Sequence, residues 1–167
     1  LIEDSAQGIG AFNGNKHSGS WGVGGCLSFY PAKVVGGLGD GGAIITNDDE
    51  LANFARSFRD HGRGDSLEAS NWGRNSRLDS INARVILERM KKVDKLINKR
   101  RKLADIYYEY LNNLEEKGFI TLPQKCSTNS KSLSTFQNFE IQASSRNKLI
   151  SYLKKHNIST IKQWGGF

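Results

Sequence analysis

The alternation of hydrophobic and polar positions in the first third of the chain predicts short strands and one helix. Ile2-Glu3-Asp4 is typical of the end of a β-strand, and residues 42–46 are typical of a further strand. The polar run at 47–50 forms a turn that can cap a helix over about 51–59, because apolar residues return there at helical spacing. This order of strand, loop, strand and helix indicates an α/β fold.

The middle of the chain predicts long helices. Asp79 or Ser80 can cap a helix over about 81–96, and a second helical stretch over about 99–117 is either separate or continuous with it. Gly118 fits the end of this second stretch. The apolar positions that recur at mostly helical spacing in the first helix are Ile81, Val85, Leu87, Met90, Val93, Leu96 and Ile97.

The end of the chain predicts the start of a small α/β unit. Residues 123–134 are polar and rich in serine, which indicates a loop. Residues 136–141 alternate as a strand does, residues 146–156 are amphipathic as a helix is, and residues 158–161 alternate again. We therefore expect a strand, a helix and a strand here.

Length and composition suit a globular protein of one domain, or of one domain and a small second one. The 167 residues are 37% hydrophobic, which is compatible with a packed core. No apolar run is long enough to span a bilayer and the N-terminus has no signal-peptide pattern, so we predict a cytoplasmic protein without a membrane partner. Cys26 and Cys126 have no metal-ligand spacing and are predicted to be reduced thiols. Because the chain starts at Leu1 and its only methionine is Met90, we expect an internal piece of a longer protein.

The charge distribution permits nucleic-acid binding but does not favour it. The net charge is +7, with a sequence pI near 9.5. Much of the excess lies in a basic cluster made of Arg84, Arg89, Lys91, Lys92, Lys95, Lys99, Arg100, Arg101 and Lys102. A basic helix can bind phosphates, but a solvated helix face is the more common meaning of such a run. Aromatic residues are not interleaved with the cluster, so no stacking platform for bases is visible.

Lys33 carries the sharpest chemical signal in the sequence. It ends the run Ser28-Phe29-Tyr30-Pro31-Ala32-Lys33, and Gly36, Gly37, Gly39, Gly41 and Gly42 follow it. The proline stiffens the approach, and the glycines allow backbone to come close to a ligand. An amine in such a setting can form a Schiff base with a carbonyl group and then carry a proton. The alternative is an ordinary solvated lysine.

Further side chains can complete a site for pyridoxal phosphate (PLP). Asp4 can form a charge-assisted hydrogen bond with the pyridine nitrogen, and Ser28 can donate to the phosphate. Gln7 shares a face with Asp4 if a helical turn joins them. The structural alternatives are a turn or cap residue for Asp4 and a strand-end hydroxyl for Ser28. Asn75 and Arg77, just before the long helix, are either simple capping and surface residues or an anion-binding corner.

In their order along the chain, several segments resemble the DegT/StrS family of PLP-dependent nucleotide-sugar aminotransferases. The matching segments are 2–7 (IEDSAQ), 19–22 (GSWG), 28–33 (SFYPAK), 39–43 (GDGGA), 46–48 (TND), 61–62 (HG), 73–78 (GRNSRL) and the Arg100-Arg101 region before a tyrosine-bearing helix. Each segment is short, but their order and spacing are specific and cover essentially the whole chain. The closing Gln163-Trp164-Gly165-Gly166 resembles a subset that acts on nucleotide-linked deoxy-keto sugars.

The resemblance implies roles for five residues. Lys33 would hold PLP covalently and act as the proton shuttle, and Asp4 would pair with the pyridine nitrogen. Gln7 would lie against the cofactor near its phenolic oxygen, and Ser28 would bind the phosphate. Asn75 would cross a dimer interface to the phosphate of the neighbour's cofactor.

The resemblance also implies a fold. The expected fold is that of the fold-type I PLP-dependent transferases, in a homodimer. Residues 1–78 would be part of the large PLP-binding α/β domain, residues 79–117 would be long connecting helices, and residues 118–167 would be an incomplete small C-terminal α/β domain.

The reaction that the resemblance implies is a transamination. An amino acid, glutamate by resemblance, would give its amino group to a keto group of a nucleotide-linked deoxy sugar, for polysaccharide or other glycan biosynthesis. The family's N-terminal phosphate-binding turn and stacking aromatic residue are missing, so we expect the isolated chain to bind PLP poorly and to be inactive. The rival hypotheses are a non-catalytic regulatory or nucleic-acid-binding protein that uses helix 84–102, and an inactive fragment.

Overall fold

The chain folds into two compact units. The computed structural model describes residues 1–65, 68–125 and 132–162. The first unit comprises residues 1–103 and 126–137, and the second comprises residues 104–125 and 138–167. The three-part division at 78 and 117 remains a prediction about the domains of the protein.

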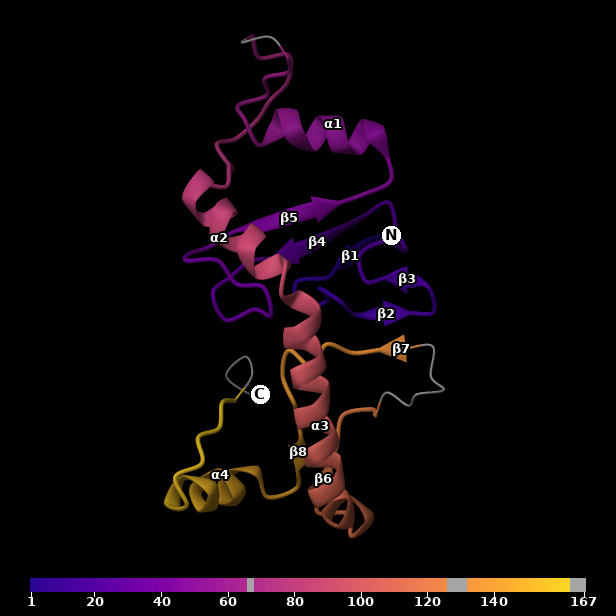
Figure 1. Cartoon of the computed structure of the whole chain (residues 1–167), viewed down its shortest axis with the longest axis vertical. Coiled ribbons are helices and arrows are strands. Elements are labelled where there is room, and N and C mark those ends of the chain that lie inside the picture. The colour runs from indigo at the N-terminus through magenta and orange to yellow at the C-terminus, as the bar shows by residue number, and fades with distance from the viewer. Residues whose placement is uncertain (66–67, 126–131, 163–167) are drawn as a thin grey trace. The chain divides into compact units, whose positions relative to one another are not determined.

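A three-stranded sheet lies at the centre of the first unit. It consists of β1 (Ile2–Asp4), β4 (Gly24–Ser28) and β5 (Gly42–Ile45), in the order β1-β4-β5 (Figure 1). β1 and β4 are parallel, with Asp4 opposite Cys26, whereas β5 is antiparallel to β4. The carboxyl ends of β1 and β4 therefore meet at one edge of the sheet.

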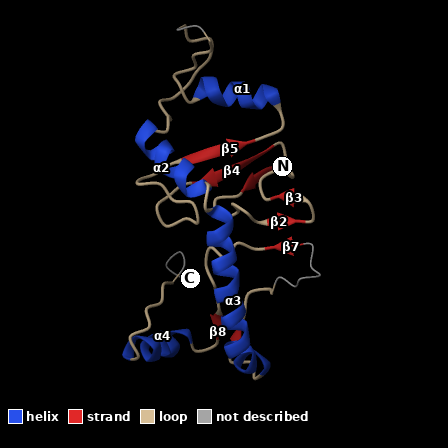
Figure 2. Ribbon diagram, in the orientation of Figure 1, coloured by secondary structure: helices blue, strands red, loops and turns tan. Residues whose placement is uncertain are grey.

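A second small sheet in the same unit is wholly antiparallel. Its strands are β2 (Phe12–Asn13), β3 (Lys16–His17) and β7 (Ser132–Leu133), in the order β3-β2-β7 (Figure 2). The predicted loop over 123–134 thus ends in a short strand, because Leu133 pairs with Phe12 across a long stretch of sequence. Residues 126–131 of that predicted loop, and with them Cys126, lie outside the described residues.

The helix caps follow the sequence. Asp48 accepts a hydrogen bond of 3.0 Å from the N–H of Leu51 at the start of α1 (Asp49–Phe58). Asp79 does the same for Asn82 at 2.7 Å, at the start of α2 (Ser80–Met90). Both are the expected N-caps, since a short carboxylate side chain satisfies N–H groups that lack an intrahelical partner.

The predicted division of the long helices lies too far along the chain, by almost two helical turns. The helix expected over 81–96 ends at Met90, and α3 runs without a break over Val93–Glu116. Gly118 follows with a φ of 73°, the left-handed conformation that ends a helix readily at glycine. Because α3 contributes to both units, its residues up to Leu103 belong to the first unit and those from Ala104 to the second.

The core of the first unit is made by residues from four segments. Its buried members are Ile9, Val34, Val35, Ile86 and Ile97. Of these, Val35 is completely inaccessible to solvent. The segment that carries Lys33 is thereby anchored in the core immediately after the lysine.

The predicted apolar face of the first long helix is wrong for four of its members. Ile81, Leu87, Met90 and Leu96 are 74%, 52%, 40% and 39% exposed, and Leu96 lies in α3. The residues that α2 buries are Asn82 and Ile86. Apolar spacing misses this face because a polar amide lies at its centre.

The second unit holds a short antiparallel pair and a helix. β6 (Ile120–Thr121) pairs with β8 (Gln142–Ala143), and α4 (Arg146–Lys155) follows at almost the predicted position. Tyr108 donates to the carbonyl oxygens of Pro123 and Gln124 at 3.0 and 3.3 Å. No helix within the described parts of the chain is both long and apolar enough to cross a membrane.

Two predicted strands are absent from the described residues. Residues 136–141 are not extended as a strand, because Phe136 has a φ of 48° that breaks the alternation. The described residues 158–161 also form no strand. The strand that forms near the first prediction is β8, one residue beyond its end.

Candidate active site around Lys33

Lys33 lies on a loop whose two ends are tied together. We call residues 29–41 the Lys33 loop. The N–H of Phe29 donates to the carbonyl of Gly41, and the carbonyl of Phe29 accepts from the N–H of Gly37, both at 2.7 Å. The N–H of Lys33 donates to Tyr30 at 2.9 Å, which forms a tight turn at the lysine itself. A loop closed at its base in this way holds its tip in a defined position.

The Lys33 side chain is half-buried and uncommitted. No hydrogen bond or ion pair joins its amine to any residue in the described part of the chain. The two valines that follow it are buried in the core. The lysine thus has a fixed backbone and a free amine, which is the combination that a covalent attachment point needs.

Helix α2 supports the far side of the Lys33 loop. The buried Asn82 accepts from the N–H of Leu38 at 2.8 Å and donates to the carbonyl of Asp40 at 3.3 Å. Arg89 donates to the carbonyl oxygens of Gly36 and Gly37. Neither residue belongs to the site expected from the sequence; for Asn82, the usable signal was a polar residue four positions before Ile86 on one helical face.

Gln137 supports the near side of the Lys33 loop. Its side-chain amide accepts from the N–H of Val34 and donates to the carbonyl of Ala32, each at 2.8 Å. These two groups flank Lys33 in the sequence. Nothing local could have revealed this contact, because more than one hundred residues separate the partners.

The strand register brings Asp4 and Ser28 to one edge of the sheet. Asp4 is the last residue of β1 and lies opposite Cys26, and Ser28 ends the neighbouring parallel strand two residues later. Neighbouring strands lie about 4.8 Å apart. Since Ser28 also opens into the Lys33 loop, the three predicted residues belong to adjoining positions of the fold.

The side-chain oxygens of Asp4 and Ser28 retain some of their capacity to form hydrogen bonds. One carboxylate oxygen of Asp4 accepts from the N–H of Ala6 at 3.1 Å. Ser28 Oγ accepts from the N–H of Tyr30 at 3.3 Å, which leaves its own O–H able to donate. Within the described residues, the second oxygen of Asp4 has no hydrogen bond, so both side chains can take a ligand.

Gln7 and Asn75 form hydrogen bonds with other parts of the described chain. Gln7 follows β1 in a turn with an exposed side chain, and its carbonyl accepts from Thr135 at 3.2 Å. The side chain of Asn75 is exposed and accepts from Arg77 at 3.1 Å, while its backbone bridges to Asp60. Arg77 also pairs with Asp60 at 3.1 Å. Asn75 therefore belongs to a segment that is tied to the end of α1.

The side chain of Glu3 holds the backbone of a nearby turn. Its two carboxylate oxygens accept from the backbone N–H groups of Gly19, Trp21 and Gly22. Desolvation raises the pKa of the Glu3 carboxyl, but the hydrogen bonds from Gly22, Gly19 and Trp21 together lower it more, so the pKa lies below its ordinary value. The sequence analysis gave Glu3 no role.

The basic cluster does not form one free cationic face. Arg89, Arg100 and Arg101 donate to backbone carbonyl groups within the first unit. Arg84 and Lys91 both pair with Glu88 at 2.9 Å, and the pKa of Glu88 is lowered chiefly by the Lys91 hydrogen bond. Much of the local charge therefore has a structural use or a partner.

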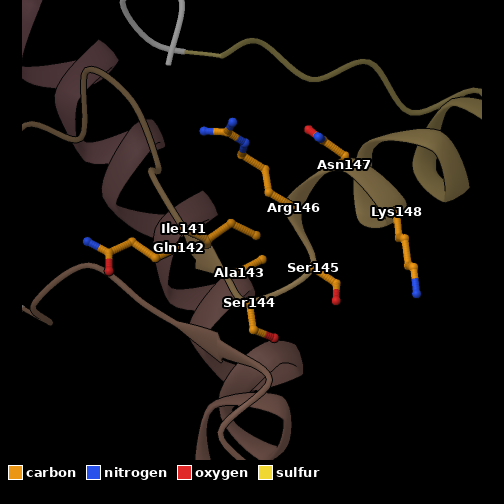
Figure 3. A pocket seen from close by; sticks show the side chains of 8 residues that line it. All are labelled: Ile141, Gln142, Ala143, Ser144, Ser145, Arg146, Asn147 and Lys148. Carbon is orange, nitrogen blue, oxygen red and sulfur yellow. The ribbon is translucent and has the colours of Figure 1, made fainter. Parts of the chain in front are cut away.

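The second unit offers a less defined feature. Figure 3 shows a hollow at the start of α4, lined by residues 141–148. Its lining residues are exposed or only partly buried, and the N-cap Ser145 makes no side-chain capping bond. Among the described residues, no group of His, Cys, Asp and Glu side chains could hold a metal ion.

Comparison with known proteins identifies the family. The model of the DegT/DnrJ/EryC1/StrS aminotransferase family matches residues 1–164. A pleiotropic regulatory protein of Geobacillus stearothermophilus is 37% identical over 161 residues, which are 96% of this chain and 42% of that protein. The dTDP-3-amino-3,4,6-trideoxy-α-D-glucose transaminase of Micromonospora megalomicea is 36% identical over 124 residues, 74% of this chain and 33% of the relative.

Solved structures agree with this assignment. The crystal structure of a DegT DnrJ EryC1 StrS aminotransferase from Brucella abortus superposes with a TM-score of 0.88 and 35% identity. The match covers 98% of this chain and 42% of that one. The chain thus spans less than half the length of the relatives it matches, as an α/β segment of the fold-type I aminotransferase class. The chain belongs to the DegT/DnrJ/EryC1/StrS aminotransferase family.

Proposed function

We propose that the protein is a PLP-dependent sugar aminotransferase in which Lys33 is the covalent attachment point of the cofactor. The observation that supports this proposal is that Asp4 and Ser28 end two strands on one side of the sheet, where the loop that carries Lys33 also begins. Asp4 and Ser28 end two neighbouring parallel strands, and the Lys33 loop starts where the second strand ends. Ligands in α/β folds bind at this end of parallel strands.

The side chains at this edge fit the chemistry of PLP. Asp4 has a carboxylate oxygen without a hydrogen bond among the described residues, and an anion suits a protonated pyridine nitrogen. Ser28 has an O–H that can donate to a phosphate oxygen. Lys33 has an amine without an ion pair in the described part of the chain, which suits attack on an aldehyde.

Each residue then has one task in the proposed site. When bound, PLP supplies an electron sink that stabilises negative charge on a substrate carbon. Asp4 keeps the pyridine nitrogen protonated, Ser28 holds the phosphate, and Gln7 contacts the ring near its phenolic oxygen. Lys33 would hold PLP covalently through its amine, and the same amine would carry a proton when it is free. Asn75 reaches the cofactor phosphate of a partner subunit in a homodimer.

The proposed substrates are a nucleotide-linked keto sugar and an amino acid, with glutamate as the donor. The transaminase relative from Micromonospora is named for an amino group at carbon 3 of a dTDP-linked sugar. A ketone at carbon 3 is therefore the first acceptor to test, and a ketone at carbon 4 is the comparison. The product would serve glycan biosynthesis in the cytoplasm.

A regulatory role is the second candidate, because one relative is named as a pleiotropic regulatory protein. The use of Arg89, Arg100 and Arg101 inside the first unit weighs against a nucleic-acid-binding helix face. A phosphate-binding face needs cations that are free to meet successive phosphates. The regulatory candidate predicts salt-sensitive DNA binding that does not depend on Lys33.

Activity of the protein at its full native length tests the proposal. We expect PLP and glutamate to support conversion of a 3-keto nucleotide sugar to the amino sugar, detected by mass spectrometry. Lys33→Ala should abolish conversion, whereas Lys95→Ala, at an exposed lysine of α3, should leave it unchanged. The proposal would be overturned if both variants kept their activity, or if the protein bound DNA and showed no transamination.

A further inference from the structure

One side chain forms hydrogen bonds with both peptide groups that flank Lys33. Gln137 Oε1 accepts from the N–H of Val34 and Nε2 donates to the carbonyl of Ala32, both at 2.8 Å. This is the pattern by which a neighbouring β-strand would pair with a residue. Here a side-chain amide provides it, because the chain around Lys33 is a turn that has no strand beside it.

Gln137 is itself held by a cation from α3. Arg100 Nη1 donates to the carbonyl oxygens of Phe136 and Gln137, each at 3.1 Å. Phe136 has a φ of 48°, a left-handed conformation that is unfavourable for a bulky residue. Such strain persists only where surrounding contacts over-determine it, and it gathers at functional sites.

The contacts on the two sides of the loop differ in what they can control. Asn82 and Arg89 bind residues 36–40, several positions after the lysine. Val34 and Val35 anchor the chain by burial, which fixes position but resists rotation of a peptide group weakly. Only Gln137, among the described residues, makes directional bonds to both peptides adjoining Lys33.

We infer that Gln137 is a positioning residue that sets the orientation of Lys33 through the peptide groups on either side of it. The inference rests on the proposed function, since it concerns the amine that would bind PLP. A rotation of either peptide swings the Cα–Cβ bond of the lysine and displaces the amine at the end of its flexible stem. We call the two hydrogen bonds of Gln137 the clamp. The clamp restricts the orientation of the Lys33 amine and so raises the rate at which the amine reacts with the aldehyde of PLP.

Two variants of Gln137 distinguish the effects of its two hydrogen bonds, and a third variant at another glutamine is the control. Gln137→Met keeps the length of the side chain and removes both hydrogen bonds. Gln137→Glu keeps an acceptor for Val34 but sets a carboxylate against the carbonyl of Ala32. The matched control is Gln142→Met, at an exposed glutamine of β8 in the second unit.

Two readouts on the protein at full native length are needed. The first is amide hydrogen exchange at Val34, followed by mass spectrometry with residue-resolved fragmentation in the absence of PLP. The second is the rate of PLP attachment to Lys33, trapped by borohydride at timed intervals. Thermal unfolding of each variant checks that the fold persists.

We expect Gln137→Met to speed exchange at Val34 by about fivefold, since the net contribution of one hydrogen bond corresponds to about a factor of five in the opening equilibrium. Attachment to Lys33 should slow by a similar or larger factor. Gln137→Glu should leave exchange at Val34 near the wild-type rate and still slow attachment, and Gln142→Met should change neither rate.

Unchanged attachment in both Gln137 variants overturns the inference, whatever happens to exchange. Unchanged exchange at Val34 in Gln137→Met also overturns it. If Gln137→Met fails to fold, Gln137→Glu decides alone by its attachment rate. Absence of any adduct on Lys33 in the wild-type protein is a different result: it refutes the proposed function, and with it this role of the clamp.

Discussion

Gly25 and Gly19 pack backbone against backbone. A Cβ atom added to Gly25 would lie 2.6 Å from the carbonyl oxygen of Gly19, well inside contact distance. Gly25 belongs to β4, and Gly19 belongs to the turn that Glu3 holds. The strand that ends at Ser28 therefore packs directly against that turn. The position of this strand depends on the absence of a side chain at Gly25.

Substitution of Gly25 by alanine should destabilise the protein. The new methyl group must push the 19–22 turn away, and overpacking of this kind costs about 1–3 kcal/mol or more. Denaturant unfolding measures the effect. Gly64→Ala is the matched control because open space surrounds its Cβ position, and it should change stability by less than about 0.5 kcal/mol. Equal effects at both positions would refute the packing argument.

Glu3→Gln should lower stability at neutral pH and have little effect in acid. The pKa of Glu3 is lower in the folded state than its ordinary 4.5, so the ionised carboxylate stabilises the fold above that pH. This contribution disappears as the pH falls through the lowered pKa. Unfolding curves of both proteins, recorded from pH 7 downward, should therefore converge once the pH is below the lowered pKa of Glu3.

The control for this charge removal is Glu109→Gln, at an exposed residue of α3. It should shift the unfolding curve little at any pH. A gap between wild type and Glu3→Gln that stays constant with pH would show that the three backbone hydrogen bonds do not depend on ionisation.

Two arginines of α2 should differ sharply in their contribution to stability. Arg89 donates to the carbonyl oxygens of the buried Gly36 and Gly37, whereas Arg84 pairs only with Glu88 at the surface. Arg89→Met should cost about 1–3 kcal/mol, because it leaves buried acceptors unsatisfied. Arg84→Met should cost less than about 0.5 kcal/mol. Denaturant unfolding tests the pair, and similar losses would contradict the role given to Arg89.

Arg100 should be coupled to Gln137. Arg100→Met removes the two hydrogen bonds that Arg100 donates to the carbonyl oxygens of Phe136 and Gln137, so it should speed exchange at Val34 as Gln137→Met does. The double variant should show clearly less than the sum of the two effects, because the residues act in series. Lys99→Met, at the exposed neighbouring position, is the control. Full additivity would mean that Arg100 and Gln137 act independently.

Local chemistry made much of this fold predictable from the sequence. Asp48 and Asp79 precede apolar-periodic stretches and cap the helices as expected. Gly118 ends α3, and Ile2–Asp4 is a strand. These features depend on residues close together in the chain, where capping and turn preferences act directly.

Long-range contacts explain what the sequence did not reveal. The alternation at 136–141 resembles that of a strand. However, the side-chain amide of Gln137 forms hydrogen bonds with the peptide groups beside Lys33, and Phe136 adopts a left-handed φ. On α2 the amide of Asn82 is buried by the Lys33 loop, while the apolar Ile81 stays exposed. Neither pairing follows from local periodicity.

The candidate site was predictable in part for the same reason. Asp4 and Ser28 were each expected near the end of a strand, and they end β1 and β4. The parallel pairing of these two strands was not predicted from the sequence. Gln163-Trp164-Gly165-Gly166 lies outside the described residues. The supporting residues Arg89 and Gln137 could not be expected, because their partners are carbonyl and N–H groups that almost every residue possesses.

Mapping of the PLP attachment site tests the central claim most directly. The protein at full native length is incubated with PLP, reduced with borohydride, digested and sequenced by mass spectrometry. Our account predicts a single reduced adduct on the ε-amine of Lys33, absent from Lys33→Ala and retained in Lys95→Ala. An adduct on another lysine, or equal labelling of many exposed lysines, would contradict it.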